Sequence, residues 1–281
     1  MACWGGNAVF SRLAVGEVSP MLLVSFRWFG AGVLLAIFAH KKIRHDWPVI
    51  LANKWYLIAM GAIGFAIFNS LMYVAAHSTT AVNIGIIQGA MPAIVLIGAF
   101  LFYQTPVSRL QIMGVCVTFA GVIIVGIGGD LSHLADLALN HGDVLMLIAV
   151  FLYSGYTVGL RKRPQMSALS LFSAFTFAAF IASLPLTATE IVTGQLIWPT
   201  AKGWVVVGLI MALPSFIAQI SFIHSVALVG PGRAGAFVNL VPVFASIFAV
   251  GYLNEPFEIF HGIALLMVLG GIWLSERGKA P

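Results

Sequence analysis

The sequence predicts an all-α integral membrane protein with ten transmembrane helices that form two inverted five-helix repeats. Of the 281 residues, 60% are hydrophobic and only 8% are charged, the apolar runs are continuous, and the second half of the chain repeats prolines and glycines of the first. A soluble domain carries about 25% charged residues, so lipid must be the solvent for much of the surface. Continuous runs of about twenty apolar residues favour helices over the alternating pattern of a barrel strand.

Ten apolar runs are the candidate spans, and short turn-forming segments separate them. The spans cover residues 1–15, 20–39, 55–76, 80–102, 107–127, 144–160, 167–188, 201–225, 234–253 and 257–275. Glycine and proline favour turns, as in Gly230-Pro231-Gly232. Pro106 excludes one helix across the fourth and fifth spans, because proline breaks the hydrogen-bond pattern of a helix interior.

Basic residues are distributed unevenly between the two sides of the predicted bundle. If the amino terminus is cytoplasmic, the cytoplasmic segments hold Lys41, Lys42, Arg44, Lys54, Arg109, Arg161, Lys162, Arg163, Arg233, Arg277 and Lys279. The opposite loops hold only Lys202. By the positive-inside rule we expect both termini in the cytoplasm and the chain in the inner membrane. The same rule explains the net charge of +5 without a nucleic-acid partner.

An offset of 150 residues aligns the second half of the chain with the first without a gap. It pairs Asn69 with Gln219, Gly85 with Gly235, Pro92 with Pro242, Pro106 with Pro256 and Gly121 with Gly271. An offset of 149 pairs Trp4 with Tyr153 and Arg12 with Arg161. Five spans are an odd number, so the two copies must have opposite orientations, as in many secondary transporters. We predict one repeat over residues 1–128 and the other over residues 142–276.

Several of these residues together resemble a known family. The first span contains Trp4-Gly5-Gly6-Asn7, and the sixth opens with Gly142-Asp143. Each repeat ends with a proline-centred span, a turn before Pro106 or Pro256, and a glycine-rich span. This pattern is similar to that of the EamA-type drug/metabolite transporters over nearly the whole chain, and most to their YddG-type exporters of aromatic amino acids. Thr105 stands where the second copy has Glu255, which favours a turn or capping role for the glutamate.

The resemblance implies a fold and a mechanism as well. It implies a central cavity lined by spans one, three, four, six, eight and nine, with spans five and ten peripheral. It also implies alternating access, in which the two repeats rock about the site.

Enzyme classes find no support in the sequence. There is no Gly-x-x-x-x-Gly-Lys-Ser/Thr motif for an ATPase, and Gly128-Gly129-Asp130 has no second intramembrane aspartate to form a protease dyad. The seven histidines show no metal-ligand spacing, and we expect Cys3 and Cys116 to be free thiols. We therefore predict no catalytic residue, no metal and no cofactor.

Polar and aromatic residues within the spans are the candidate substrate-binding groups, because polar groups are costly in lipid. They are Trp4, Asn7, Asn69, Tyr73, His77, Gln88, Tyr153, Tyr156, Ser215, Gln219 and Asn239. Amides and hydroxyls can instead join helices by hydrogen bonds, and histidines near span ends, such as His77, can lie in the aqueous interface. The mid-span position of Tyr153 and Tyr156 and the match of Asn69 with Gln219 favour a binding site.

Three prolines interrupt spans and are candidate hinges. Pro92, Pro214 and Pro242 each remove a backbone donor, so a carbonyl in the same helix needs another partner or a wet cavity. A packed static kink is the alternative interpretation for each.

The charges indicate what the site accepts. All nine acidic residues fall in or beside predicted loops, so we expect little dependence on a sodium or proton gradient. Arg27 is the clearly intraspan charge. Neutralisation of a substrate carboxylate is one interpretation, but we expect helix packing or pairing with a backbone carbonyl, because the resemblance implies that span two is peripheral.

Neutral amides and hydroxyls beside aromatic rings suit a zwitterion with an apolar or aromatic side chain. They suit a nucleotide sugar poorly, because phosphates need several basic partners. We therefore expect a carrier that exports amino acids, including aromatic ones, across the bilayer. A monomer is the expected state, although no sequence feature determines it. The alternatives are a carrier of another metabolite such as a nucleotide sugar or purine, a passive channel, and a scaffold without transport.

Overall fold

The computed structural model describes residues 1–130, 140–230, 234–235 and 237–278, and every regular element in these ranges is a helix. Up to residue 130 the helices are α1 (Ala2–Leu13), α2 (Pro20–Phe38), α3 (His40–Ala52), α4 (Lys54–Gly61), η1 (Ala62–Ile67), α5 (Phe68–Ala75), α6 (Ala81–Gln88), α7 (Met91–Tyr103) and α8 (Arg109–Gly126). After residue 140 they are α10 (His141–Gly159), η2 (Leu160–Lys162), α11 (Ala168–Val192), α12 (Ala201–Ile210), η3 (Met211–Ile217), α13 (Ala218–Val229), η4 (Phe237–Leu240), α15 (Val241–Leu253) and α16 (Ile259–Arg277).

The lengths and composition of these helices confirm a helical membrane protein. Within the described ranges, eight helices are long and apolar enough to cross a membrane, and Phe237–Leu253 is a shorter apolar helix. Large apolar side chains lie on the outer surface, such as Phe177 at 65% exposure and Leu266 at 73%. Such a surface requires lipid around it. The short α1 has 12 residues, so the count of ten spans stays a prediction.

Helix α3 is an element that the hydropathy pattern did not predict. Its lysines and arginine make it polar on average, so residues 40–54 were expected as a loop between spans. In the structure Asp46 of α3 accepts a hydrogen bond from the backbone nitrogen of Ser167 at 3.0 Å, at the start of α11. Hydrogen bonds from Ser170 and Ser167 hold the pKa of Asp46 below its usual value. The basic helix α3 is therefore attached to the helical bundle through this hydrogen bond.

Matching features recur in the two halves at the predicted offset. The π-helices η1 and η3 interrupt spans at equivalent places. Helices α7 and α15 both carry proline in their first turn and both end at a residue with φ of +52°, Gln104 and Asn254. Capping boxes then start α8 at Ser108 and α16 at Glu258. These features support the predicted repeat, while the inverted relation of the halves stays a prediction.

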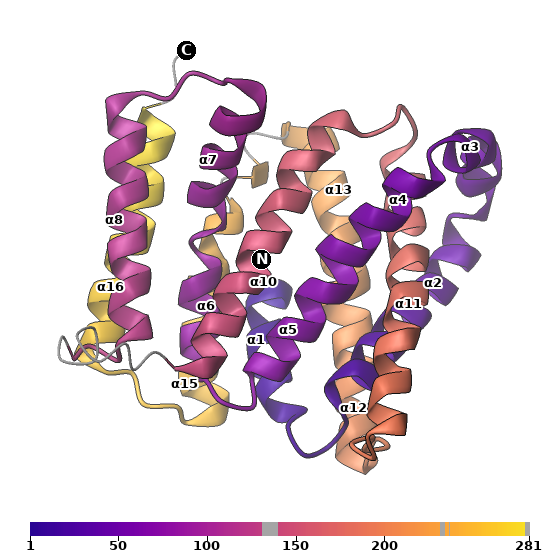
Figure 1. Cartoon of the computed structure of the whole chain (residues 1–281), viewed down its shortest axis with the longest axis horizontal. Coiled ribbons are helices and arrows are strands. Elements are labelled where there is room, and N and C mark those ends of the chain that lie inside the picture. Colours follow the sequence, from indigo (N-terminus) through magenta and orange to yellow (C-terminus); the bar gives the residue numbers. More distant parts are fainter. Residues whose placement is uncertain (131–139, 231–233, 236, 279–281) are drawn as a thin grey trace.

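Helices α8 and α16 pack against each other at one side of the molecule (Figure 1). A Cβ atom at Gly114 of α8 would clash with the carbonyl oxygen of Gly271 in α16, and one at Gly271 would clash with that of Gly114. Gly121 lies against the carbonyl oxygen of Ala264 in the same way, with 2.9 Å for an added Cβ. The glycines therefore allow close helix packing, and the two helices lie at the periphery as expected.

The molecule has two ends that differ in their connections. The carboxyl-terminal end of α16 and the α7–α8 connection lie at the upper edge of Figure 1, and the α1–α2 and α15–α16 connections lie at the lower edge. We call these the carboxyl-terminal end and the opposite end. Most of the basic residues that we expect in the cytoplasm lie in α3, at the start of α8 and in the α10–α11 connection, which are toward the upper edge of Figure 1.

Candidate functional site

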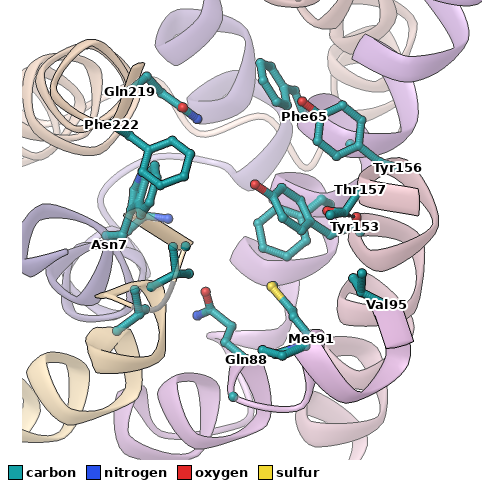
Figure 2. Close-up of a pocket in the computed structure, with 18 of the residues that line it drawn as sticks. Asn7, Phe65, Gln88, Met91, Val95, Tyr153, Tyr156, Thr157, Gln219 and Phe222 are labelled. Carbon is teal, nitrogen blue, oxygen red and sulfur yellow. Dashed lines mark hydrogen bonds between the residues drawn. The ribbon is translucent and has the colours of Figure 1, made fainter. Parts of the chain in front are cut away.

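A cavity of about 480 Å³ lies between the two halves of the chain. Its walls come from α1, α2, η1, α5, α6, α7, α10, η2, α13, η4 and α15, and from Glu276 of α16. The polar and tyrosine side chains on its wall are Asn7, Arg27, Asn69, Gln88, Tyr153, Tyr156, Thr157, Gln219, Asn239 and Glu276. Figure 2 shows the amides of Gln88 and Gln219 pointing into the open space from different walls.

Eight of the eleven predicted binding residues line this cavity. They are Trp4, Asn7, Asn69, Gln88, Tyr153, Tyr156, Gln219 and Asn239. The other three lie elsewhere: Tyr73 is buried behind the wall, His77 is exposed in the turn after α5, and Ser215 is fully buried. Their place on the cavity wall supports a role in solute binding, which stays a prediction.

The three predicted hinge prolines differ in their placement. Pro92 and Pro242 line the cavity and begin α7 and α15, so they start helices after a break in the span. Pro214 lies inside η3 and leaves the carbonyl of Ile210 without its usual partner, and the Ser215 hydroxyl donates to that carbonyl at 2.7 Å. The indole of Trp4 donates to the carbonyl of Pro214 at 3.1 Å. Movement at these prolines stays a prediction.

Arg27 overturns the expectation that the second span is peripheral. Helix α2 places both Arg27 and Trp28 on the cavity wall. Nη1 of Arg27 donates to the hydroxyl of Tyr73 and to Oδ1 of Asn69, both at 2.6 Å, and to Oδ1 of Asn7 at 3.3 Å. The predicted polar residues of α1 and α5 thus surround a cation that the sequence interpretation set aside. The signal was present, because Arg27 is a charge deep within an apolar run.

Aromatic rings form a continuous wall on one side of the cavity. Phe65 stacks on Trp28 with centroids 4.7 Å apart and packs against Tyr156 at 5.5 Å. Tyr153 packs against Phe68 at 4.8 Å and Tyr156 at 5.3 Å. Figure 2 shows Phe65, Tyr156 and Tyr153 together on this wall. The phenylalanines could not be distinguished by sequence from those that face lipid.

Carboxylates hold the opposite end of the molecule together. Glu255 accepts hydrogen bonds from the backbone nitrogens of Ala81 and Val82, at 3.0 and 3.1 Å, at the start of α6. Its carboxylate also lies 3.6 Å from Nε of Arg12. Glu190 of α11 caps α2 in a similar way, through the backbone nitrogens of Met21 and Leu22 at 2.8 and 3.1 Å. The predicted capping role of Glu255 is therefore correct, although the helix that it caps lies in the other half of the chain.

A second polar cluster closes the same end. Asp143 of α10 accepts hydrogen bonds from the Thr79 hydroxyl and from the amide of Asn83 at 3.2 Å. His261 accepts from the backbone nitrogen of Glu258 through Nδ1, so its Nε2 carries the proton and donates to Oδ1 of Asn83 at 3.1 Å. None of the residues of these contacts lines the cavity.

The cavity extends toward the carboxyl-terminal end. Its lining reaches Leu160, the first residue of η2 directly after α10, and Glu276, near the end of α16. No residue of the turns at 14–19, 76–80 or 254–258 belongs to the described lining. The described lining thus extends to the carboxyl-terminal end and stops short of the opposite end, and we call these the open end and the closed end.

One protein-family match extends over nearly the whole chain. The model of the EamA-like transporter family matches residues 1–127 and 140–277. The chain belongs to this family. EamA-like proteins are transporters and not enzymes, which agrees with the absence of any predicted catalytic motif. Among the described residues, no group of three or more His, Cys, Asp or Glu side chains could hold a metal ion.

Similar proteins cover nearly the same length. The uncharacterized transporter YetK of Bacillus subtilis is 24% identical, with 99% of this chain and 85% of that protein covered. The uncharacterized inner membrane transporter YedA of Escherichia coli K12 is also 24% identical, with 98% and 88% covered. A solved crystal structure superposes with a TM-score of 0.64 at 17% identity and covers 98% of this chain and 94% of its own. That likeness shows that the EamA-like chain shares its fold with a solved protein.

Proposed function

We propose that this EamA-like transporter exports amino acids, including aromatic ones, across the inner membrane by alternating access. The observation that carries the proposal is the cavity of about 480 Å³, which combines an aromatic wall with neutral amides and hydroxyls. Aromatic rings prefer offset or edge-on neighbours, which Tyr153, Tyr156 and Phe65 can offer to a solute ring. Gln88, Gln219 and Asn239 supply donors and acceptors for the polar part of the solute.

The difference between the two ends supports alternating access. Glu255 and Arg12 join the two halves at the closed end. The offset places Thr105 where Glu255 stands and Arg161 where Arg12 stands. At the carboxyl-terminal end, Nη1 of Arg161 donates to the Thr105 hydroxyl at 3.3 Å. Equivalent positions in the two repeats thus join the halves at both ends. The pair at the closed end contains a carboxylate, and the pair at the carboxyl-terminal end contains a hydroxyl in its place.

The distribution of carboxylates supports weak coupling to ion gradients. Asp143, Glu190 and Glu255 accept hydrogen bonds at the closed end and lie outside the cavity lining. Glu276 is the acidic residue of the described lining, and it lies at the open end. A coupling ion commonly uses an acidic side chain deep in the membrane. We therefore expect exchange of solute without an imposed gradient.

The alternative solutes and the channel interpretation fit the cavity less well. A nucleotide sugar carries several negative charges, and within the described lining Arg27 is the only lysine or arginine. A passive channel needs a path that is open at both ends, whereas hydrogen bonds and an ion pair close one end here.

Counterflow in liposomes tests the proposal. Vesicles with the purified protein are loaded with unlabelled phenylalanine and diluted into labelled phenylalanine, without a proton or sodium gradient. We expect transient accumulation of label that protein-free vesicles do not show. Uptake only under an imposed gradient would contradict the weak coupling, and movement of nucleotide sugars but not amino acids would contradict the solute class.

A further inference from the structure

The guanidinium of Arg27 is a buried charge without an acidic partner. Its side chain is 5% exposed and lies on the cavity wall. The ion pairs among the described residues are Arg12–Glu255 and Lys202–Glu17, so Arg27 has no carboxylate within 4.0 Å there. An unpaired charge in a membrane interior is expensive and marks a functional site.

The hydrogen bonds of Arg27 leave donors unused. All of its bonds within the described chain come from Nη1 and go to the neutral groups of Asn7, Asn69 and Tyr73. Nε is buried without a partner. Nη2 has no partner in the described chain and is not among the buried unpartnered atoms, so it is accessible from the cavity. The guanidinium is a rigid planar fork of donors, so its Nη2 can donate to a carboxylate oxygen in the cavity.

The network around Arg27 fixes the direction of this fork. The amide nitrogen of Asn69 donates to the carbonyl of Phe65 at 2.6 Å, so its oxygen is directed at Arg27. The Tyr73 hydroxyl accepts from Arg27 and donates to Asn7 at 3.4 Å. The guanidinium carbon lies 4.8 Å from the ring centroid of Trp28, which stacks on Phe65. Aromatic surface therefore begins directly beside the charge.

From this geometry we infer that Arg27 binds the carboxylate of the transported solute and that the neighbouring rings bind its aromatic or apolar part. The inference rests on the proposed function and names the part of the solute that the cavity selects. A solute without a negative charge leaves the guanidinium unpaired in the membrane. Carboxylates are therefore preferred over neutral molecules of the same shape.

Binding of a matched pair of compounds tests the inference without requiring transport. The compounds are 3-phenylpropionate and 3-phenylpropanamide, which share the ring and chain and differ in charge. Calorimetry on the protein in lipid nanodiscs gives a Kd for each. Hydrogen bonds between charged groups predict that wild-type protein binds the acid roughly tenfold to a hundredfold more tightly than the amide.

Substitutions assign the preference to Arg27. In Arg27→Gln we expect similar Kd values for the acid and the amide, and in Arg27→Lys a reduced preference for the acid, because the charge stays and the fork is lost. Arg109→Gln is the matched control, because Arg109 is exposed at the start of α8 and should leave the preference unchanged. A merely structural arginine would lower the melting temperature in Arg27→Gln and leave the ratio of the two Kd values unaltered.

The outcomes separate this inference from the proposed function. Equal Kd values in wild-type protein, binding of neither compound, or a preference that persists in folded Arg27→Gln would each overturn the inference. If Arg27→Gln does not fold, the wild-type ratio and Arg27→Lys still decide. Phenylalanine counterflow without a carboxylate preference overturns the inference and leaves the proposed function. A carboxylate preference without amino-acid flux supports the inference and overturns the proposed function.

Discussion

At the scale of single side chains, some polar residues of the cavity wall are hydrogen-bonded within the protein, and others are left unbonded toward the cavity. Asn69 is 3% exposed and uses both ends of its amide within the protein, toward Arg27 and Phe65. Gln219 is half-buried, lines the cavity and makes no hydrogen bond with the described chain. Asn69 thus holds the cavity wall in place, whereas the Gln219 amide is available to a solute.

Alanine at these two positions should therefore have different effects. We expect Gln219→Ala to raise the half-saturating concentration for phenylalanine counterflow several-fold and to leave the free energy of unfolding within about 0.5 kcal/mol. We expect Asn69→Ala to weaken transport and also to destabilise the protein by about 1.5–3 kcal/mol, because a buried hydrogen bond to a charged group is lost. Counterflow and thermal unfolding measure the two quantities. Normal counterflow with lower stability in Gln219→Ala would mean that this amide only joins helices.

The cost of polar groups in lipid was sufficient to predict from sequence most polar residues of the cavity wall. Gln88 and Tyr153 were found in this way, and both line the cavity. The same argument also selected His77 and Ser215, although His77 is exposed in the turn after α5 and Ser215 bonds the backbone of a π-helix. Arg27 was visible as a charge but was assigned to packing, since the arrangement of α2 beside α1 and α5 is a tertiary property.

At the scale of elements, the turns after α7 and α15 share one backbone geometry and differ in one side chain. The backbone nitrogens of Thr105 and Glu255 each bond a carbonyl six residues earlier at 3.3 Å. The Glu255 carboxylate caps α6 and pairs with Arg12, whereas the Thr105 hydroxyl accepts one bond from Arg161. A carboxylate is stabilising at the start of a helix, so the contacts of Glu255 are stronger than the contact between Thr105 and Arg161.

Thr105→Glu should strengthen the contact at the carboxyl-terminal end. The new carboxylate can pair with Arg161, as Glu255 pairs with Arg12, and should shift the population toward closure of the open end. The measurement is the rate at which a cysteine placed at Val95 on the cavity wall reacts with a membrane-impermeant maleimide from the carboxyl-terminal side. We expect slower reaction in Thr105→Glu than in Thr105→Gln, which adds the same length without charge. Equal rates would show that this position does not control the opening.

Helices could be predicted from the sequence wherever they coincide with a long apolar run. The predicted run 107–127 and α8 (Arg109–Gly126) agree within two residues at either end. The break between α6 and α7 at Gly89 and Ala90 was indicated only by Pro92, and α3 was hidden by its charge. Hydropathy reports contact with lipid, so it does not detect a polar helix at the membrane surface.

At the scale of the whole molecule, the cavity extends toward the carboxyl-terminal end and not toward the closed end, within the described residues. The two halves meet around the cavity, and the features that recur at the offset of 150 lie on both sides of it. The central claim is that a solute occupies this cavity while it crosses the membrane. In the proposed alternating access, the two halves rock so that the cavity opens to one side of the membrane at a time.

Protection of a cavity cysteine by solute tests that claim most directly. Cys3 and Cys116 are free and are replaced by serine, and Val95→Cys or the control Val205→Cys, at 61% exposure on the outer surface, is added. We predict that phenylalanine slows maleimide labelling at position 95 but not at 205, and that labelling at 95 stops counterflow. Labelling at 95 that is indifferent to phenylalanine, together with full counterflow by the labelled protein, would contradict the account.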